Sequence, residues 1–199
     1  MPEPHLPIPR ARNRFARRVT AALLCAGACV SATGAERRLN TQTNTWNWTQ
    51  VADGFSIELV QLHGDYVSAV FGSKGFTEAM LDELGRYCYY GTIVRNVSDE
   101  AIHMRVADWF ARTADGRDVP LKTKADWIAD WAAAGVPFKW LMLADDVTFE
   151  KNDWIQGFSS VQLPRDAKFD FHYVWHVEGQ RHEAVINDVE CPPAHLPAR

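Results

Sequence analysis

The chain has 199 residues, 21 of them basic and 25 acidic, and a formal net charge of −4. Removal of the first 35 residues, which hold five arginines and one glutamate, leaves 16 basic and 24 acidic residues and a net charge of −8. Nucleic acids and anionic membranes are bound through clustered Lys and Arg, so this charge balance argues against both as partners. The remaining length suits one domain with a single sizeable core.

Residues 1–35 have the features of a bacterial signal peptide. A region with five arginines precedes the apolar segment VTAALLCAGACV, whose twelve residues fall short of the about twenty that span a bilayer. Small residues follow, and we expect cleavage after Ala35. The sequence therefore predicts a periplasmic or secreted protein. Two questions stay open: Arg17-Arg18 is compatible with twin-arginine export instead of the general route, and Cys29 is a candidate lipid attachment site. The protein would stay at the membrane only if Cys29 is lipidated or the signal is retained.

Residues 36–54 form a polar segment that we interpret as a linker or N-terminal arm. Its stretch TNTWNWTQ holds Trp46 and Trp48, and no periodicity there predicts their burial. Exposed tryptophans serve as interface anchors or as sugar-stacking surfaces. The two residues are therefore candidate contacts for a partner. The alternative is that the segment folds back and covers the domain that follows.

The main domain is predicted to span residues 55–191, with a C-terminal tail at 192–199. Seven runs rich in β-branched and aromatic residues, separated by turn residues, are expected to be strands. They cover residues 55–62, 89–97, 101–110, 137–143, 154–163, 168–177 and 181–190. This pattern predicts a mainly β (α+β) fold, a two-layer antiparallel β-sandwich.

Two helical segments interrupt the strands. Residues 64–88 contain two potential N-caps, a separating Gly75 and apolar residues at helical spacing, so we expect a helical hairpin directly after the first strand. Residues 123–135 begin with Thr123 and Asp126 in a capping-box arrangement, which predicts one further inserted helix. Two tryptophans four residues apart on that helix are expected to anchor the core.

The segment WIQGFSSVQLPRDAKFDFHYVW (154–175) resembles the corner where immunoglobulin-like and fibronectin-like sandwiches pass from one sheet to the other. The resemblance rests on Leu163-Pro164, a polar turn, and the alternating aromatic residues from Phe169 to Trp175. It covers these 22 residues and implies an immunoglobulin-like style of sandwich. It implies no activity, because such sandwiches carry many unrelated functions.

Two cysteines remain after removal of the predicted signal peptide, Cys88 and Cys191. An even pair of cysteines in an exported chain is most simply a disulfide. Redox and metal-binding pairs usually show the close CxxC spacing, which this pair lacks. We therefore expect a structural bridge between them.

The stretch FDFHYVWHVEGQRHE holds His172, His176 and His182 on either side of a predicted turn. His172 and His176 share one face of a strand at about 13 Å, the limit of what two imidazoles on one ion can bridge. If the loop has three residues, His182 lies diagonally close to both other histidines, which favours a copper or zinc site. If the loop consists of residues 178–179 alone, His182 faces Trp175 and the three histidines form no cluster. The sequence allows both loops. Our main expectation is a solvated strand face without a cofactor.

A second combination of metal-binding residue types is His103-Met104, since imidazole and thioether suit copper. Met104 alternates with Ile102 and Val106, however, which predicts that it is buried in the core. Asp145-Asp146 resembles a pair of catalytic acids, but adjacent loop aspartates are more typical of turns.

The sequence contains no GxSxG, no HExxH, no phosphate-binding loop and no dinucleotide fingerprint. We therefore interpret the protein as an exported noncatalytic binding or accessory protein of the bacterial cell envelope, with an envelope protein as its partner. Two alternatives are retained. One is a periplasmic copper- or zinc-handling protein that uses strand histidines. The other is an envelope glycan hydrolase, which would need two carboxylates about 5 to 10 Å apart in a cleft.

Overall fold

The structure, a computed structural model, describes residues 34–195 of the chain. Residues 1–33 of the predicted signal peptide, including Cys29, and residues 196–199 of the predicted tail lie outside the described part. The strands are β1 (Glu36–Asn40), β2 (Thr45–Ala52), β3 (Phe55–Leu62), β4 (Cys88–Asn96), β5 (Ile102–Arg105), β6 (Phe110–Thr113), β7 (Asp118–Pro120), β8 (Asp146–Phe149), β9 (Trp154–Val161), β10 (Lys168–Val177) and β11 (Gln180–Glu190). The helices are α1 (Gly64–Gly72), α2 (Glu78–Leu84), the 3-10 helix η1 (Val106–Asp108) and α3 (Lys124–Ala133).

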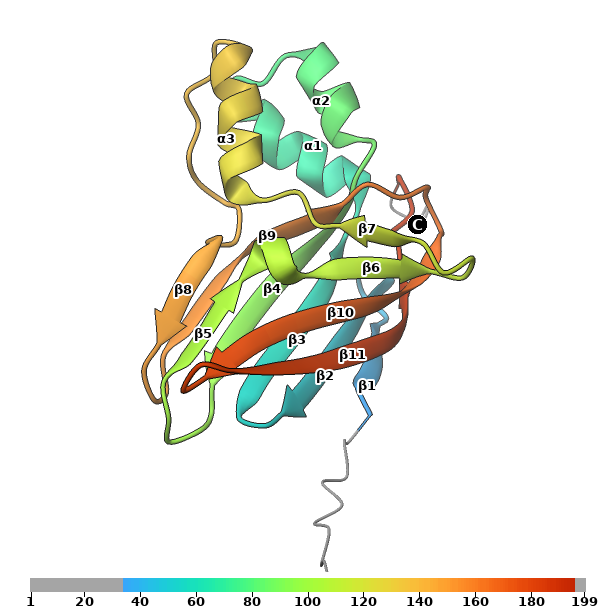
Figure 1. Cartoon of the computed structure of the whole chain (residues 1–199). Helices are drawn as coiled ribbons and strands as arrows, with labels where there is room; N and C mark the ends of the chain where they lie inside the picture. The colour runs from blue at the N-terminus through green and yellow to red at the C-terminus, as the bar shows by residue number, and fades with distance from the viewer. Residues whose placement is uncertain (1–33, 196–199) are drawn as a thin grey trace, which may run out of the picture. The chain divides into compact units, whose positions relative to one another are not determined.

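The strands form two antiparallel sheets that pack face to face (Figure 1). Sheet A has the order β1-β2-β3-β4-β9. In sheet B, β11 pairs with one edge of β10, while β6 and β5 pair one after the other with its opposite edge and carry β7 and β8 outside them. The fold is therefore the predicted mainly β, two-layer antiparallel sandwich. The chain also passes from sheet A to sheet B between β9 and β10, where the sequence predicts the corner.

The main core lies between the sheets and follows from alternation along the strands. In β3 every second residue, beginning with Phe55, is buried. In β10 the aromatic residues at alternate positions from Phe169 to Trp175 point to the same core. Phe55 stacks on Trp175 with 5.0 Å between ring centroids and on Tyr173 with 5.5 Å. Burial of each such ring contributes about 1.5 to 3 kcal/mol, so these aromatic contacts are a main attachment between the two sheets.

A disulfide joins Cys88 and Cys191, as predicted, with 5.2 Å between the Cα atoms. Cys88 begins β4 of sheet A, and Cys191 directly follows β11 of sheet B. Both residues are fully buried. The bridge therefore ties the two layers together at one end of the sandwich.

The three α-helices lie together at one end of the sandwich and enclose a second hydrophobic core (Figure 1). The hairpin α1–α2 follows β3, as predicted, and α3 begins with the predicted capping box of Thr123 and Asp126. The buried members of this helical core are Val67, Phe71, Phe76, Leu84, Tyr87, Tyr89, Trp127, Trp131 and Met142. Tyr89 belongs to β4, so the helices rest on the outer face of sheet A and not on the core between the sheets.

The prediction of a polar linker at residues 36–54 is wrong, because β1 and β2 occupy this segment. Trp46, Trp48 and Gln50 alternate with Asn47 and Thr49, and this period of two places the tryptophans on the inner face of sheet A. Trp48 is only 1% exposed. The segment thus covers the domain, which is the alternative that the sequence left open.

Two of the predicted strands also differ in the structure. Residues 137–143 form no strand of their own, and Met142 makes a single parallel bridge to Phe158. Residues 101–110 are divided into β5, η1 and the start of β6. The reason lies in the register: Met104 pairs with Trp175 and Phe110 with His172, so six steps along this segment lie opposite three steps of β10. The extra residues leave the pairing and form η1.

Candidate functional site

A hollow on the outer face of sheet A originates from Gly91 of β4. In the register of the sheet, Gly91 lies between Val60 of β3 and Phe158 of β9. These three positions share the face that points away from sheet B, because their neighbours in β4, such as Tyr90, face the core. A row of side chains crosses the sheet here, and its middle member is missing. The missing side chain leaves a gap between two apolar neighbours.

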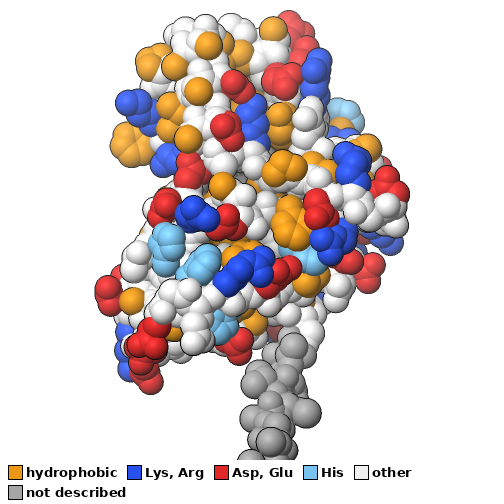
Figure 2. Space-filling model, in the orientation of Figure 1, with side chains coloured by type: hydrophobic (Ala, Val, Ile, Leu, Met, Phe, Trp, Pro, Cys, Tyr) orange, Lys and Arg blue, Asp and Glu red, His pale blue; other side chains and the backbone are white. Residues whose placement is uncertain are grey.

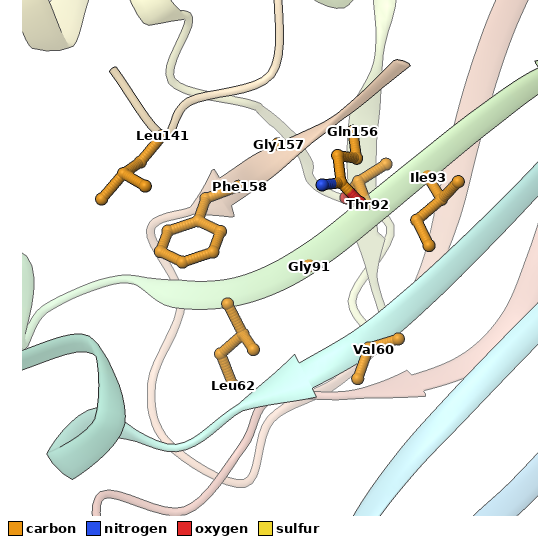
Figure 3. A pocket seen from close by; sticks show the side chains of 9 residues that line it. All are labelled: Val60, Leu62, Gly91, Thr92, Ile93, Leu141, Gln156, Gly157 and Phe158. Carbon is orange, nitrogen blue, oxygen red and sulfur yellow. The ribbon is translucent and has the colours of Figure 1, made fainter. Parts of the chain in front are cut away.

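The walls of this Gly91 hollow are mainly apolar. Figure 3 shows the side chains of Val60, Leu62, Ile93 and Phe158 around Gly91. The hollow has a volume of about 310 Å³, and its remaining lining residues are Thr92, Leu141, Gln156 and Gly157.

Packing does not require glycine at position 91. A Cβ atom added there would lie 3.8 Å from Leu62 Cδ2 and 3.8 Å from Val60 Cβ, which is ordinary contact distance. Glycine inside a strand costs about 0.5 to 1 kcal/mol relative to alanine, because it loses more conformational freedom on folding. The chain therefore keeps a destabilising residue at a place where a larger one fits. Such departures from the local optimum are typical of functional sites.

Leu141 closes one side of the Gly91 hollow, because the chain wraps around the edge of β9 there. Phe158 donates its backbone N–H to Leu141 O at 2.6 Å, and Leu143 donates its own to Phe158 O at 2.9 Å. Leu141 has a φ of 72°, a left-handed conformation that costs a leucine about 1 to 2 kcal/mol. The chain passes so close to β9 that a Cβ at Gly157 would lie 2.5 Å from Leu143 Cα. Gly157 is thus required for packing, whereas Gly91 is not.

Large apolar side chains near the hollow are exposed. Trp140, which directly precedes Leu141, is 72% exposed. Tyr66 of α1 is 50% exposed, with its ring centroid 6.5 Å from that of Phe158. Trp154 lies further along β9 on the same outer face, and the Arg95 guanidinium sits 5.4 Å from its ring centroid. Exposed aromatic side chains of this kind are frequent at interaction sites.

The lining of the Gly91 hollow limits its chemistry. It contains no Asp, Glu, His, Cys, Lys or Arg side chain, and its polar groups are the Gln156 side chain and the backbone, because the Thr92 hydroxyl is buried against Ser159 Oγ at 2.6 Å. Nothing in it can act as a general acid, a general base or an activated nucleophile. The arrangement suits the binding of an apolar group.

The structure separates the three histidines that the sequence grouped. Val177 pairs with Gln180 and Trp175 with His182, so the loop is the two-residue turn 178–179. Both turn residues have positive φ, 49° and 79°, as in the type I′ turns that match the twist of a hairpin. His182 therefore stacks on Trp175, with 5.5 Å between ring centroids, on the face opposite to His172 and His176. The three-histidine cluster, which the longer of the two possible loops would have allowed, does not form.

His172 is not on a solvated face either. It is 7% exposed, and its ring stacks on Phe110 with 4.5 Å between centroids and an interplanar angle of 11°. Its Nδ1 lies 3.0 Å from Glu183 Oε1. Hydrogen bonds from His172 and then from Arg181 lower the pKa of the Glu183 carboxyl. His172 is a structural residue of sheet B. The expectation that it lies on a solvated strand face is therefore wrong.

The other predicted site residues take structural roles. Trp46 is half-buried under the Arg37 guanidinium, 3.8 Å from its ring centroid, and Arg37 forms an ion pair with Glu190 at 3.2 Å. Asp145 accepts the first backbone N–H groups of α3, from Lys124 at 2.6 Å and Ala125 at 2.7 Å, as a negative charge at a helix N-terminus should.

The sequence interpretation missed Gly91. The signal was present, because an isolated glycine inside the strand pattern YYGTIVRNV marks a bulge or a place where something else approaches the sheet. No protein-family model, curated protein or solved structure matches this chain. Within residues 34–195, no helix has the length and apolar character needed to cross a membrane. The function therefore has to be inferred from the residues of the chain itself.

Proposed function

We propose that the protein is an exported noncatalytic binding or accessory protein of the bacterial cell envelope, and that it takes an apolar group of an envelope protein partner into the Gly91 hollow. The observation that carries this proposal is the open apolar hollow itself. It lies where position 91 has no side chain, although an added Cβ atom would make only ordinary contacts there. The basic and apolar N-terminal region supports the exported location.

The size of the hollow indicates what it would take. Its volume of about 310 Å³ is at the lower end of the range of ligand sites, about 300 to 1,000 Å³. This space suits one large side chain, such as Leu or Phe, better than an extended cofactor. Burial of such a side chain contributes about 1.5 to 3 kcal/mol, typical of one anchor residue within a larger interface. The exposed rings of Trp140 and Tyr66 would supply the surrounding contact area.

The binding function is favoured over glycan hydrolysis by the absence of carboxylates from the lining of the hollow. A glycosidase of the usual kind needs two of them on either side of the bond it cleaves. Aromatic rings at the surface would serve a sugar or a protein equally well, but the apolar walls around Gly91 match a side chain and leave the hydroxyl groups of a sugar without partners.

The test uses the Gly91→Val variant, which fills the hollow, and the Thr49→Val variant as its matched control. Thr49 is exposed on the same face of sheet A, on β2, and does not line the hollow. Both changes place an apolar branched residue on that face, and valine suits a strand at either position. Mature tag-free protein is coupled to a matrix and exposed to envelope extract of the source cells. We expect a discrete partner to be retained by the parent and by Thr49→Val, and lost with Gly91→Val.

Two results would overturn the proposal. One is a partner that Gly91→Val retains as well as the parent does, and the other is turnover of envelope glycans by the purified parent. Thermal unfolding of all three proteins shows whether lost binding reflects a filled hollow or a damaged fold. The exported location is tested separately, by N-terminal sequencing of the protein from fractionated cells. We expect a mature N-terminus near Glu36 in the periplasmic or secreted fraction, and an unprocessed cytoplasmic chain would contradict export.

A further inference from the structure

A second group of polar side chains lies on the opposite side of the molecule, on the outer face of sheet B. His176 of β10 is the direct cross-strand partner of His103 of β5. Asp146 of β8, the next strand outward, is opposite Arg105, two pairs along from the pair of His103 with Thr148 and therefore on the same face. Figure 2 shows histidine side chains beside acidic and basic ones on this face. Three adjacent strands thus bring two imidazoles and a carboxylate to one place.

The two imidazoles have nearly the spacing that a shared metal ion requires. Metal–nitrogen bonds of about 2.0 to 2.1 Å place each ring centroid about 3 Å from the ion. Two rings on one ion are therefore about 5 to 6.5 Å apart, the longer value applying as the ligands approach a straight line. The centroids of His103 and His176 are 6.1 Å apart, with an interplanar angle of 39°. The two rings of this directly opposed pair are far closer than His172 and His176, whose separation of about 13 Å along one strand made them a poor site.

The hydrogen bonds leave ring nitrogens available for an ion. His103 Nε2 lies 2.7 Å from Asp146 Oδ1, which leaves Nδ1 of that ring. In His176 the Nδ1 atom is buried and has no hydrogen-bond partner. The other ring nitrogen, Nε2, is therefore the one that would bind an ion on the outer face of the sheet. A carboxylate on the second ring nitrogen is the usual companion of a metal-binding histidine, because it fixes the tautomer and the orientation of the ring. Asp146 already has this position next to His103.

There is room for an ion and its water ligands. A hollow of about 510 Å³ lies over this part of sheet B, and His103, His176, Asp146 and Glu178 are among its lining residues. Within residues 34–195, no group of three or more His, Cys, Asp or Glu side chains is arranged to hold a metal ion. The protein can therefore offer two imidazole ligands, and the other positions would be filled by water.

We propose that His103 and His176 form a two-imidazole site for a divalent transition metal, with Asp146 as a positioning residue for His103. Imidazole suits Zn²⁺ and Cu²⁺, and for a given set of nitrogen ligands Cu²⁺ binds more tightly than Zn²⁺. The order of affinity is therefore Cu²⁺ before Zn²⁺. The site does not rest on the Gly91 hollow, which lies on the other sheet.

The experiment titrates tag-free protein with Cu²⁺ and Zn²⁺ and records calorimetric binding and the midpoint of thermal unfolding. A metal that binds only the folded state raises that midpoint by mass action. We expect the midpoint of the parent to rise with Cu²⁺, and the rise to be lost in His103→Gln and in His176→Gln. His182→Gln is the matched control, because it removes a histidine from the same hairpin on the opposite face, and we expect it to bind like the parent.

Asp146→Asn tests the positioning role separately. Loss of such an outer partner typically weakens metal binding about 10- to 100-fold, and we expect a change of this size with the metal-free midpoint unchanged. Nitrogen ligands should also be visible in the electron paramagnetic resonance spectrum of the Cu²⁺ form. The site would be refuted by a parent whose midpoint does not respond to either metal, or by a response that both single-histidine variants keep. An unchanged affinity in Asp146→Asn would refute the role of that carboxylate.

Discussion

The same substitution, glycine to alanine, is expected to have opposite effects at two neighbouring positions of sheet A. Gly91 of β4 and Gly157 of β9 are almost opposite each other, since Gly91 pairs with Phe158 and Gly157 with Thr92. Neither glycine has a positive φ. Alanine can therefore adopt the backbone conformation at both sites, and the difference depends only on what the new methyl group meets.

The distances decide the sign at each site. At Gly91 the nearest atoms are 3.8 Å away, so alanine fits and stabilises the fold by about 0.4 to 1 kcal/mol through a less flexible unfolded chain. At Gly157 the methyl group would lie 2.5 Å from both Cα and N of Leu143, against the about 3.5 to 4.0 Å of an unstrained contact. The loop must then move about 1 Å, and overpacking of this kind costs about 1 to 3 kcal/mol.

The assay is urea and thermal unfolding of the two variants beside the parent, with the disulfide intact. In a domain of this length 1 kcal/mol corresponds to about 2 to 4 °C, so the midpoint should rise by about 1 to 4 °C in Gly91→Ala and fall by about 2 to 12 °C in Gly157→Ala. A loss of stability in Gly91→Ala would mean that the hollow is a packing requirement and not a retained space. A neutral Gly157→Ala would mean that residues 141–143 do not lie tightly against β9.

Three further results are expected. Loss of the bridge between Cys88 and Cys191 in Cys191→Ser should lower the free energy of unfolding by about 2 to 5 kcal/mol, and parent protein whose midpoint does not change on reduction would contradict this. Asn96→Ala should lower the free energy of unfolding by about 1 to 3 kcal/mol, as measured by urea unfolding. The reason is that Asn96 Nδ2 donates to Glu100 O at 2.7 Å and to the buried Phe149 O at 3.1 Å. Because the pKa of Glu183 is lowered in the folded protein, its hydrogen bond with His172 stabilises the fold above the pKa of an unfolded glutamate. This stabilisation is lost as the pH falls through the lower pKa of Glu183 in the folded protein. Glu183→Gln should therefore flatten the fall in unfolding midpoint below about pH 4.3, and an unchanged profile would count against this contact.

Alternation along the strands was enough to predict much of the sandwich. Phe169, Phe171, Tyr173 and Trp175 repeat with a period of two, and their common face is the core face of β10. The same period is present in Trp46 and Trp48, but the polar residues around them obscured it, and β2 was interpreted as a linker. Burial of Trp48 depends on contacts such as that with Tyr90 of β4, 42 positions away in the sequence, whose ring centroid lies 6.3 Å from that of Trp48.

Other features depend on contacts that no local pattern contains. The two loops possible after β10 differ by one residue, and the choice rests on Glu178 accepting a positive φ, which glutamate rarely does. Leu141 likewise takes a left-handed conformation that its apolar neighbours would not suggest. The pair His103–His176 joins strands about seventy residues apart, so its spacing became visible only with the register of sheet B.

The second hydrophobic core has a consequence for the order in which the molecule assembles. It is built from two insertions, α1–α2 before β4 and α3 after β7, and their contacts cross between them: Phe71 and Phe76 both lie against Trp131, at 5.5 and 5.3 Å between centroids. Neither insertion can cover its own apolar side chains. We therefore expect the helical core to be completed only after the intervening strands have brought the two insertions together. Before Trp131 packs against them, Phe71 and Phe76 are exposed and can be bound by a chaperone or a protease that recognises exposed apolar segments.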